Sequence, residues 1–319
     1  MRAAINRTYG PPEIIRILDV PKPEPKENEI LIKVHASTVN RTDCGFLFAR
    51  PFITRFFSGL LRPKYRCLGC EFAGEVEAVG GSVTRFKTGD RVFGFNDGRF
   101  GGHAEYTVAG ENDAVALIPE NISYETAAAL TEGGHYALCD LRAAKIGPGQ
   151  RWLINGGTGA IGSAAIQLAK YFGAEVTAVC AGPNVELVRS LGPDRVIDYT
   201  AQDFTQLPEK FDVVFDAVGK RSFGECKPIL TENGIYMSTE LGPNSENPFL
   251  GLLSFFTKGK RVLFPIPYIN RQDVEFLGTL AKNKQFTPLI DRKYPLEQIV
   301  DAYNYVETGM KIGNVIITM

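Results

Sequence analysis

The chain has 319 residues, of which 44% are apolar and 22% charged, and its formal net charge at pH 7 is −1. This length is enough for one large or two ordinary cores, and the near-neutral charge offers no basic field for nucleic acid. The sequence shows neither a secretory leader nor an apolar run near the ~18 to 20 residues of a membrane span, and its six cysteines are scattered. We therefore expect a cytoplasmic globular protein.

Residues 1 to about 120 have the pattern of a compact, barrel-like β domain. Short apolar runs alternate with Gly, Pro, Asn and Asp, which favour turns. The runs expected to form strands are Glu29–Val34, Ala73–Val79, Arg91–Phe95 and His103–Val108.

From Ser123 the pattern changes to helix, with Ser123 and Thr126 as candidate caps. Strands and helices then alternate to about residue 266, which predicts a parallel, doubly wound sheet with helices on both faces. The expected strands are Arg151–Asn155, Val176–Cys180, Arg195–Asp198, Asp212–Ala217, Gly234–Thr239 and Val262–Ile266. The remaining chain predicts helices over 271–282 and 295–308 and a strand at Asn314–Thr318.

The first strand of the alternating region runs into closely spaced glycines. Gly157, Gly159 and Gly162 have GxGxxG spacing, which permits a tight turn, close approach of a pyrophosphate to the backbone, and close packing of helix on strand. The spacing alone is a weak signal, but the flanking strand and helix supply the βαβ setting that the motif requires. Free N–H groups in the first helical turn suit phosphate. The sequence therefore predicts a dinucleotide site.

Further motifs are spread along the chain: Asn28–Val34, Ala36–Asp43, Gly69–Val76, Gly80–Phe93, Asn155–Gly173 and Ser190–Tyr199. Together they resemble the medium-chain dehydrogenase/reductase superfamily, and within it the zinc-free branch that is similar to quinone oxidoreductases. The resemblance covers essentially the whole chain. It implies an α/β protein with a GroES-like β-barrel catalytic domain (1–120 and 267–319), a doubly wound Rossmann domain (121–266), and a catalytic cleft between them. It also implies a homodimer, with the sheet edge near Val262–Ile266 as the expected contact.

The same superfamily contains zinc alcohol dehydrogenases. Where those enzymes place a cysteine ligand before Thr-Asp, this chain has Asn40, and where they carry Gly-His-Glu it has Gly69-Cys70-Glu71. Cys67 and Cys70 have C-x-x-C spacing, but no second cluster of ligands accompanies them, and the family's four-cysteine structural loop is missing. We expect no zinc and interpret these cysteines as packed thiols.

The expected cofactor is NADPH, with NADH less favoured. An NAD site places an acidic residue about 20 residues beyond the glycines, whereas here the second strand ends at Cys180 and Ala-Gly-Pro-Asn follows. By resemblance to NADPH-dependent reductases, Asn184 and Tyr199 lie at the 2′-phosphate. Asn184 also suits a helix cap, and Tyr199 also suits packing against the sheet. The full set expected to bind the cofactor is Asn40, Thr131, Gly157, Thr158, Gly159, Ala160, Ile161, Gly162, Cys180, Asn184, Tyr199, Ala217, Val218 and Asn314.

Reduction of an acceptor that is already electrophilic needs no Lewis acid. Hydride adds to a quinone, or to the β-carbon of an α,β-unsaturated carbonyl, when the reactants are held close and a hydrogen-bond donor stabilises the oxygen. The candidate catalytic residues are Asn40, Thr42 and Tyr136. By resemblance Asn40 lies near the nicotinamide and the substrate, although it also suits a turn. Glu132 and His135 are a further acid/base pair, at a spacing that surface neighbours on a helix also show.

The segment Cys44–Leu61 carries phenylalanines where related reductases often have tyrosines: Phe46, Phe48, Phe52, Phe56 and Phe57. Three interpretations are open, namely a lid over the substrate, a contact with a membrane surface, and a helix packed on the barrel. The aromatic content favours a small hydrophobic quinone or carbonyl substrate.

The leading hypothesis is therefore a zinc-independent NADPH-dependent reductase of quinones or activated alkenes. One alternative is an NAD(P)-dependent alcohol or aldehyde dehydrogenase. Another is a catalytically silent, nucleotide-binding accessory protein.

Overall fold

In the computed structural model, which describes residues 1–254 and 256–319, the chain divides into two compact units. Unit 1 comprises Met1–Glu132, Ile269–Lys284 and Pro288–Met319, and unit 2 comprises Gly133–Tyr268 and Gln285–Thr287. The sequence predicts the first boundary at residue 120, twelve residues earlier. The intervening stretch belongs to unit 1 because its helix α3 (Tyr124–Ala128) packs against strands β3 (Glu29–Val39) and β4 (Glu71–Val79).

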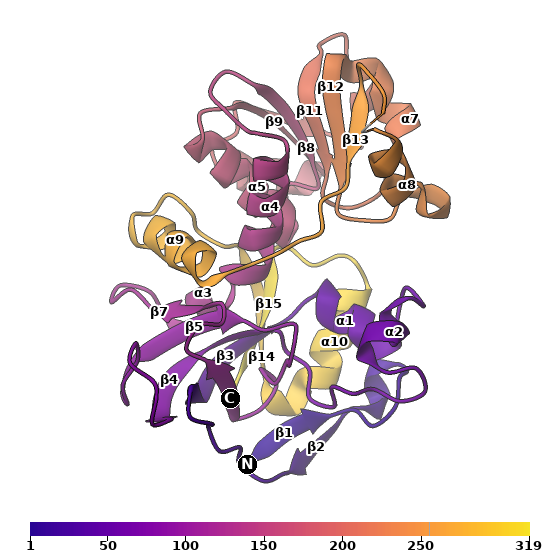
Figure 1. Ribbon diagram of the computed structural model, residues 1–319. Coiled ribbons are helices and arrows are strands. Elements are labelled where there is room, and N and C mark those ends of the chain that lie inside the picture. Colours follow the sequence, from indigo (N-terminus) through magenta and orange to yellow (C-terminus); the bar gives the residue numbers. More distant parts are fainter. Residues whose placement is uncertain (255) are drawn as a thin grey trace. The chain divides into compact units, whose positions relative to one another are not determined.

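Unit 1 is built around the long strand β3, of which almost every side chain is buried. β4 pairs with it along one side, β6 pairs with the first half of the other side, and β15 pairs with the second half. The sheet order is β14-β15-β3-β4-β5-β7, and β1 and β2 form a separate antiparallel pair (Figure 1). The remaining strands of unit 1 are β1 (Arg2–Ile5), β2 (Arg16–Asp19), β5 (Arg91–Phe95), β6 (Tyr106–Gly110), β7 (Val115–Leu117), β14 (Ile290–Pro295) and β15 (Asn314–Thr318).

The first 120 residues are not wholly β, which corrects the expectation from sequence. Helices α1 (Arg41–Phe48) and α2 (Thr54–Ser58) follow β3. α1 begins at Asn40 because the Asn40 side chain accepts the N–H of Asp43 while the Asp43 carboxylate accepts the N–H of Asn40. Unit 1 also contains α9 (Arg271–Lys282) and α10 (Ile299–Glu307), where the sequence predicts helices.

Unit 2 contains the parallel sheet that the sequence predicts. Its order is β10-β9-β8-β11-β12-β13, and each neighbouring pair is parallel. This is the doubly wound dinucleotide-binding order: β8, β9 and β10 are added toward one edge of the sheet, and β11, β12 and β13 are added toward the other edge. The switch point lies between β8 and β11. The strands are β8 (Arg151–Asn155), β9 (Glu175–Cys180), β10 (Arg195–Asp198), β11 (Phe211–Asp216), β12 (Leu230–Ser238) and β13 (Arg261–Leu263).

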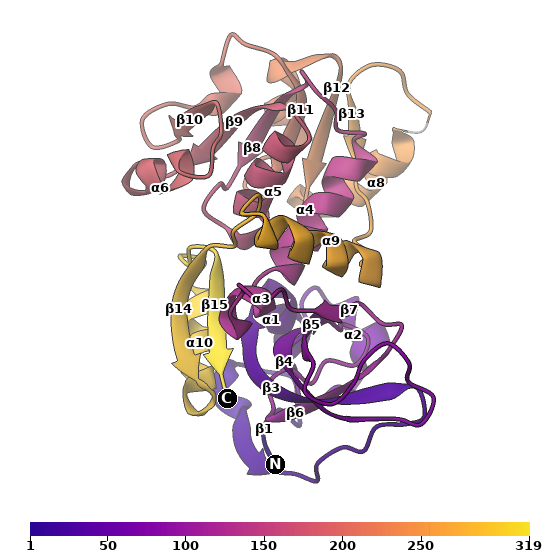
Figure 2. The same ribbon diagram turned by 90° about the vertical axis from the view of Figure 1, so that its left-hand side faces the viewer.

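Helices cover the sheet of unit 2. α4 (Thr131–Ala143), whose first two residues belong to unit 1, and α5 (Ala160–Tyr171) lie along one face (Figure 2). The other helices are α6 (Val185–Arg189), α7 (Phe223–Cys226) and α8 (Glu246–Leu253). The strands are buried on both faces, so they read as continuous apolar runs in sequence. Within residues 1–254 and 256–319, none of the helices has both the length and the apolar character needed to cross a membrane.

Candidate functional site

The carboxyl ends of β8, β9 and β11 meet at one edge of the unit 2 sheet. Asn155, the last residue of β8, lies opposite Val179 of β9 and Asp216 of β11. The chain then turns through Gly156, which has φ of +88°, and the Val179 carbonyl accepts the N–H groups of Gly156 and Gly157 at 3.1 and 2.9 Å. Helix α5 begins after Gly159. The glycines therefore form the strand, turn and helix start that suit a pyrophosphate.

Two glycines of the turn differ in what surrounds them. A Cβ added to Gly162 would lie 2.1 Å from the carbonyl oxygen of Gly156, so only glycine at this position lets the helix pack closely against the turn. A Cβ added to Gly159 would come no nearer than 3.5 Å to the same oxygen. Thr158, Ala160 and Ile161 are half-buried around it. This part of the turn is open to a ligand, and the residues present fit a dinucleotide phosphate.

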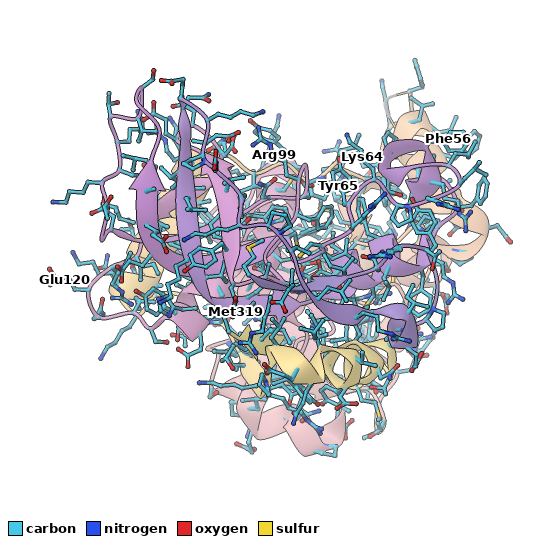
Figure 3. The ribbon with its side chains drawn as sticks, turned by 90° about the horizontal axis from the view of Figure 1, so that it is seen from below. Phe56, Lys64, Tyr65, Arg99, Glu120 and Met319 are labelled. Carbon is cyan, nitrogen blue, oxygen red and sulfur yellow. The ribbon has the colours of Figure 1, made fainter. Side chains whose placement is uncertain are left out.

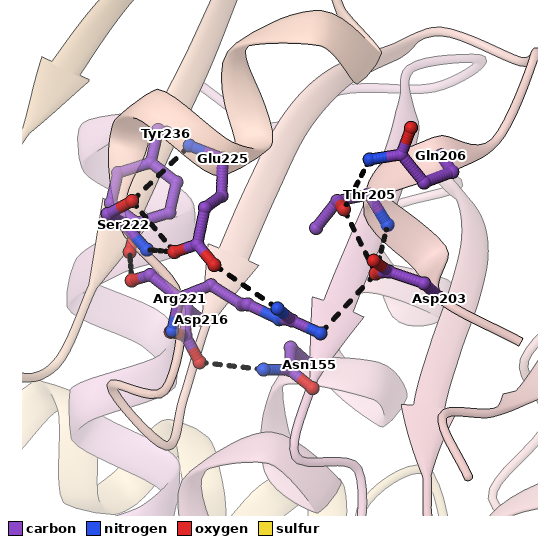
Figure 4. Close-up of polar contacts among 9 residues, drawn as sticks. All are labelled: Asn155, Asp203, Thr205, Gln206, Asp216, Arg221, Ser222, Glu225 and Tyr236. Carbon is purple, nitrogen blue, oxygen red and sulfur yellow. Dashed lines mark hydrogen bonds and ion pairs between the residues drawn. The ribbon is translucent and has the colours of Figure 1, made fainter.

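Asp216 holds the loop that follows β11. Its carboxylate accepts the side-chain amide of Asn155 at 2.9 Å (Figure 4). It also accepts the N–H groups of Val218, Gly219 and Arg221 at 3.2, 3.1 and 2.8 Å. Ala217 and Val218 are half-buried on this loop. Sequence reasoning missed Asp216, although an aspartate ending a buried strand is a visible signal.

The loop is tied down further by Arg221. Its guanidinium contacts the carboxylates of Asp203 at 3.3 Å and Glu225 at 3.2 Å, and its carbonyl accepts the Tyr236 hydroxyl at 2.5 Å (Figure 4). Ser222 and Glu225 cap α7 reciprocally. The Ala217–Val218 loop is thus fixed before any ligand arrives, which lowers the ordering cost of binding.

The end of β9 corrects one expectation. The sequence shows no carboxylate after Cys180, but β10 brings Asp198 opposite Cys180 in the sheet register. A Cβ added to Gly182 would lie 2.5 Å from the Asp198 carboxylate. That carboxylate accepts the Thr200 N–H at 2.8 Å and hydroxyl at 2.7 Å, which hold its pKa below the usual range.

The two residues expected at the 2′-phosphate lie in the same part of unit 2. Tyr199 follows Asp198 and is 53% exposed. Asn184 occupies the position before α6, but among the described residues its side chain makes no capping hydrogen bond. Arg189 pairs with Glu186 of its own helix. Cys180 is buried, and burial raises the pKa of its thiol to about 11.

A buried polar cluster in unit 1 gathers residues from four elements. Glu71, at the start of β4, is its centre and is completely buried. Its carboxylate accepts the hydroxyls of Thr38 and Thr131, the latter at 2.7 Å, and the N–H of Glu132 at 2.6 Å. Burial raises the pKa of Glu71, while these donors oppose the rise because they stabilise the charged form.

Asn40 joins this cluster through its side chain. Its amide nitrogen donates to the Cys70 sulfur at 3.2 Å and to Glu71 at 3.4 Å, while its oxygen caps α1. The two sequence interpretations of Asn40, a turn residue and a site residue, are therefore compatible. Asp43, on the same first helical turn, is buried, and burial raises its pKa to about 7.

Glu132 has an unusual environment. It is 5% exposed, and one carboxyl oxygen accepts the Thr42 hydroxyl at 2.9 Å. The other oxygen, Oε2, is buried and has no hydrogen-bond partner among the described residues. Burial, and then the nearby charge of Glu71, raise the pKa of Glu132 well above the ordinary value, because both disfavour the charged form. Burial lowers the pKa of Lys311, which interacts with both carboxyls.

Tyr136 and Asn314 are the remaining expected residues. Tyr136 is half-buried on α4 in unit 2, with its ring centroid 4.6 Å from that of His135. Asn314 is buried in β15, and its amide nitrogen donates to the Leu289 carbonyl at 2.9 Å. Unit 1 thus brings together Asn40, Thr42 and Thr131, with Glu71 and Glu132.

The donor set around Asn40 does not suit zinc. The Asn40 amide nitrogen is itself a donor, burial raises the pKa of the Cys70 thiol, and Glu71 already accepts several hydrogen bonds. Zinc prefers deprotonated thiolates, imidazoles and available carboxylates. In the described part of the chain, no three His, Cys, Asp or Glu side chains are grouped to hold a metal ion.

Comparison with known proteins gives matches along nearly the whole chain. The families described as alcohol dehydrogenase GroES-like domain and zinc-binding dehydrogenase match residues 26–145 and 191–317. The chloroplastic quinone-oxidoreductase homolog of Spinacia oleracea is 34% identical over 97% of this chain and 95% of that protein. The chloroplastic NADPH-dependent alkenal/one oxidoreductase of Arabidopsis thaliana is 31% identical, over 99% and 79%. The solved quinone oxidoreductase from Coxiella burnetii is 29% identical, with a TM-score of 0.89 and coverage of 100% and 99%.

Proposed function

Because the chain belongs to the medium-chain dehydrogenase/reductase superfamily, we propose that it is a zinc-independent, NADPH-dependent reductase of quinones or α,β-unsaturated carbonyl compounds. The observation that carries the chemistry is Glu132, a buried carboxyl with a raised pKa, one oxygen that accepts the Thr42 hydroxyl and one oxygen without a partner among the described residues. The sequence and unit 2 support a pyridine nucleotide as cofactor.

The glycine turn and the Asp216 loop supply the nucleotide site in this proposal. The N–H groups at the start of α5 bind the pyrophosphate above Gly159, and Ala217 and Val218 flank it on the rigid loop. Asn184 and Tyr199 bind the 2′-phosphate of NADPH. Thr200 donates two hydrogen bonds to the Asp198 carboxylate. These donors offset part of the repulsion between this carboxylate and the 2′-phosphate.

The reaction takes place at the unit 1 cluster. Bound NADPH supplies the hydride. The Asn40 amide orients the acceptor carbonyl and stabilises the charge that develops on its oxygen. Glu132 delivers the single proton that, together with the hydride, completes the two-electron reduction of an enone or a quinone, and water then returns a proton to Glu132. Thr42 fixes the Glu132 side chain through Oε1 and leaves the Oε2 side available.

The proposal also covers assembly and location. We infer a homodimer that forms at the β13 edge of unit 2, because an unpaired strand edge needs a cover. We keep a cytoplasmic location as a proposal, although the two relatives described above are named as chloroplastic. Localisation of a fluorescent fusion would test it.

The first experiment is anaerobic oxidation of NADPH and NADH by metal-stripped protein. The acceptors are 1,4-benzoquinone, 9,10-phenanthrenequinone, an enone, an alkenal and a simple aldehyde. Turnover of a quinone, enone or alkenal with a preference for NADPH is expected. Activity only on the aldehyde after zinc is restored would instead identify an alcohol or aldehyde dehydrogenase, and NADPH binding without any turnover would identify an accessory protein.

Asn40→Ser tests the assigned role of Asn40. Serine retains a capping oxygen for α1 but removes the amide donor, so folding and NADPH affinity should persist. Turnover should fall roughly 100-fold, as for loss of one oxyanion donor. Steady-state kinetics with melting temperature as the folding control decide the matter, and wild-type turnover would remove Asn40 from the mechanism.

A further inference from the structure

The second half of the Cys44–Leu61 segment exposes a dense group of apolar side chains. Phe46, in α1, packs against Tyr65 and Phe100, and Leu47 is fully buried. Beyond α1 the pattern reverses, and each of the following side chains is between 55% and 85% exposed: Phe52, Ile53, Phe56, Phe57, Leu60 and Leu61. We call these six residues the apolar tip. Monomeric proteins rarely expose so much contiguous apolar surface without a partner.

The chain around the apolar tip carries only positive charge. Between Asp43 and Glu71 there is no acidic residue, whereas Arg50, Arg55, Arg62, Lys64 and Arg66 all fall in this stretch. The whole chain has a net charge of −1, so five unopposed cations are a strong local concentration. In Figure 3 the ring of Phe56 points away from the body of unit 1, with Lys64 on the same side.

The apolar tip is held in position by defined contacts. The Arg55 guanidinium lies over the rings of Tyr9 and Phe52, at 4.8 and 5.8 Å, and donates to the Leu60 carbonyl at 3.3 Å. The Tyr9 hydroxyl donates to the Gly59 carbonyl at 2.6 Å. These contacts tie α2 and its following loop to the amino-terminal part of unit 1, so the phenylalanines are presented by a built protrusion.

We propose that the apolar tip docks unit 1 onto the surface of an anionic lipid bilayer. Exposed phenylalanine, isoleucine and leucine side chains enter the headgroup region, and the arginines and the lysine of the same stretch interact with the negative surface potential. The protein lies on such a surface rather than spanning it. This inference is independent of the catalytic proposal because it concerns a different set of side chains.

The charge pattern favours a lipid surface over a second copy of the chain. A two-fold contact through the apolar tip would bring the same five cations against their equivalents, with no acidic residue in the segment to neutralise them. An anionic bilayer supplies the opposite charge. The excess of positive charge in this stretch also distinguishes the apolar tip from an apolar lid, which needs no cations.

Vesicle sedimentation with the full-length protein, without nucleotide or acceptor, tests the proposal. Phosphatidylcholine vesicles are compared with phosphatidylcholine and phosphatidylglycerol mixtures at low and high salt. We expect binding to the anionic vesicles that weakens with salt. Arg62→Gln/Lys64→Gln should weaken it about 25-fold, at about five-fold for each cation, and Phe56→Ser/Phe57→Ser should reduce it at least as much.

The matched control is Phe249→Ser/Leu252→Ser on α8, whose side chains are 62% and 60% exposed. It should bind vesicles like the wild type. An absence of anionic selectivity, or an equal loss in the α8 control, would overturn the proposal. Sedimentation of the Phe56→Ser/Phe57→Ser variant that differs from wild type in lipid-free solution would indicate self-association through the apolar tip and would also overturn the proposal. So would a raised KM of this variant for a quinone together with unchanged vesicle binding, which would indicate a lid. All substituted side chains are exposed, and melting temperatures verify folding.

Discussion

Glu132 combines a raised pKa with one carboxyl oxygen, Oε2, that has no hydrogen-bond partner among the described residues. Thr42 occupies one of its oxygens, and the other has no partner among the residues described. A buried unsatisfied oxygen costs stability, so such positions tend to be found where function needs them. A carboxyl whose pKa is raised is suited to giving up a proton to a reduced acceptor.

The first residue-scale prediction concerns the pH dependence of turnover. Because its pKa is raised, Glu132 keeps its proton to a higher pH than an ordinary carboxyl does, so wild-type kcat should fall as pH rises through that raised pKa. Glu132→Gln should lower kcat roughly 100-fold or more and abolish this alkaline fall. A variant that retains the same alkaline limb would show that another group provides the proton.

Stability offers a separate readout for the same substitution. The folded state holds the Glu132 proton at pH values where the unfolded chain has released it, above an ordinary carboxyl pKa of about 4.3. The wild type should therefore lose stability relative to Glu132→Gln as pH rises from there toward the raised pKa. Denaturant unfolding across this range measures the difference, and a pH-independent difference would contradict the raised pKa.

At the scale of elements, substitutions at two glycines of the turn between β8 and α5 should affect NADPH affinity and folding stability separately. Gly159→Ala adds a methyl group where the protein leaves room, so the melting temperature should persist while NADPH affinity falls at least about ten-fold, since the pyrophosphate needs bare backbone. Gly162→Ala adds one 2.1 Å from the Gly156 oxygen and should cost about 1 to 3 kcal/mol of stability. Calorimetric titration and thermal unfolding distinguish the two, and wild-type affinity in Gly159→Ala would count against the site.

The same elements show what can be predicted from sequence. The strand, turn and helix from Arg151 to Tyr171 are contiguous, and each leaves a local pattern of apolar or glycine residues. The bond from Thr42 to Glu132 joins residues 90 apart, and that from Thr131 to Glu71 joins residues 60 apart. Such contacts depend on how distant segments of the chain come together within unit 1, which no local pattern records.

Two further differences have the same origin. Asp198 enters the nucleotide edge from β10, and only the pairing of β10 with β9 reveals it. β1 and β2 were not predicted from sequence, because they are short and partly exposed and so lack a strong apolar alternation. The phenylalanine-rich segment was predictable in composition, but its division into a buried and an exposed half depends on Tyr65 and Phe100.

At the scale of the whole molecule, the β13 edge gives a test of assembly. β13 ends the sheet order of unit 2, and Ile266 just beyond it is 86% exposed. Ile266→Asp should convert the proposed dimer to a monomer in sedimentation velocity, because it places a charge in an apolar contact. Leu117→Asp, on β7 of unit 1 and also at an exposed position, serves as the control. A wild-type monomer would remove the dimer from the proposal.

The order of segments in unit 1 has a consequence for synthesis of the protein. Strand β15 lies inside the sheet, between β14 and β3, and it consists of residues 314–318 (Figure 2). During translation, residues 133–268 of unit 2 can emerge and fold before β15 has been synthesised. The second half of β3 therefore lacks its partner strand, β15, on one side until then. The nascent chain therefore exposes an open strand edge of β3 until residues 314–318 have emerged, and during this interval aggregation and chaperone binding compete with folding.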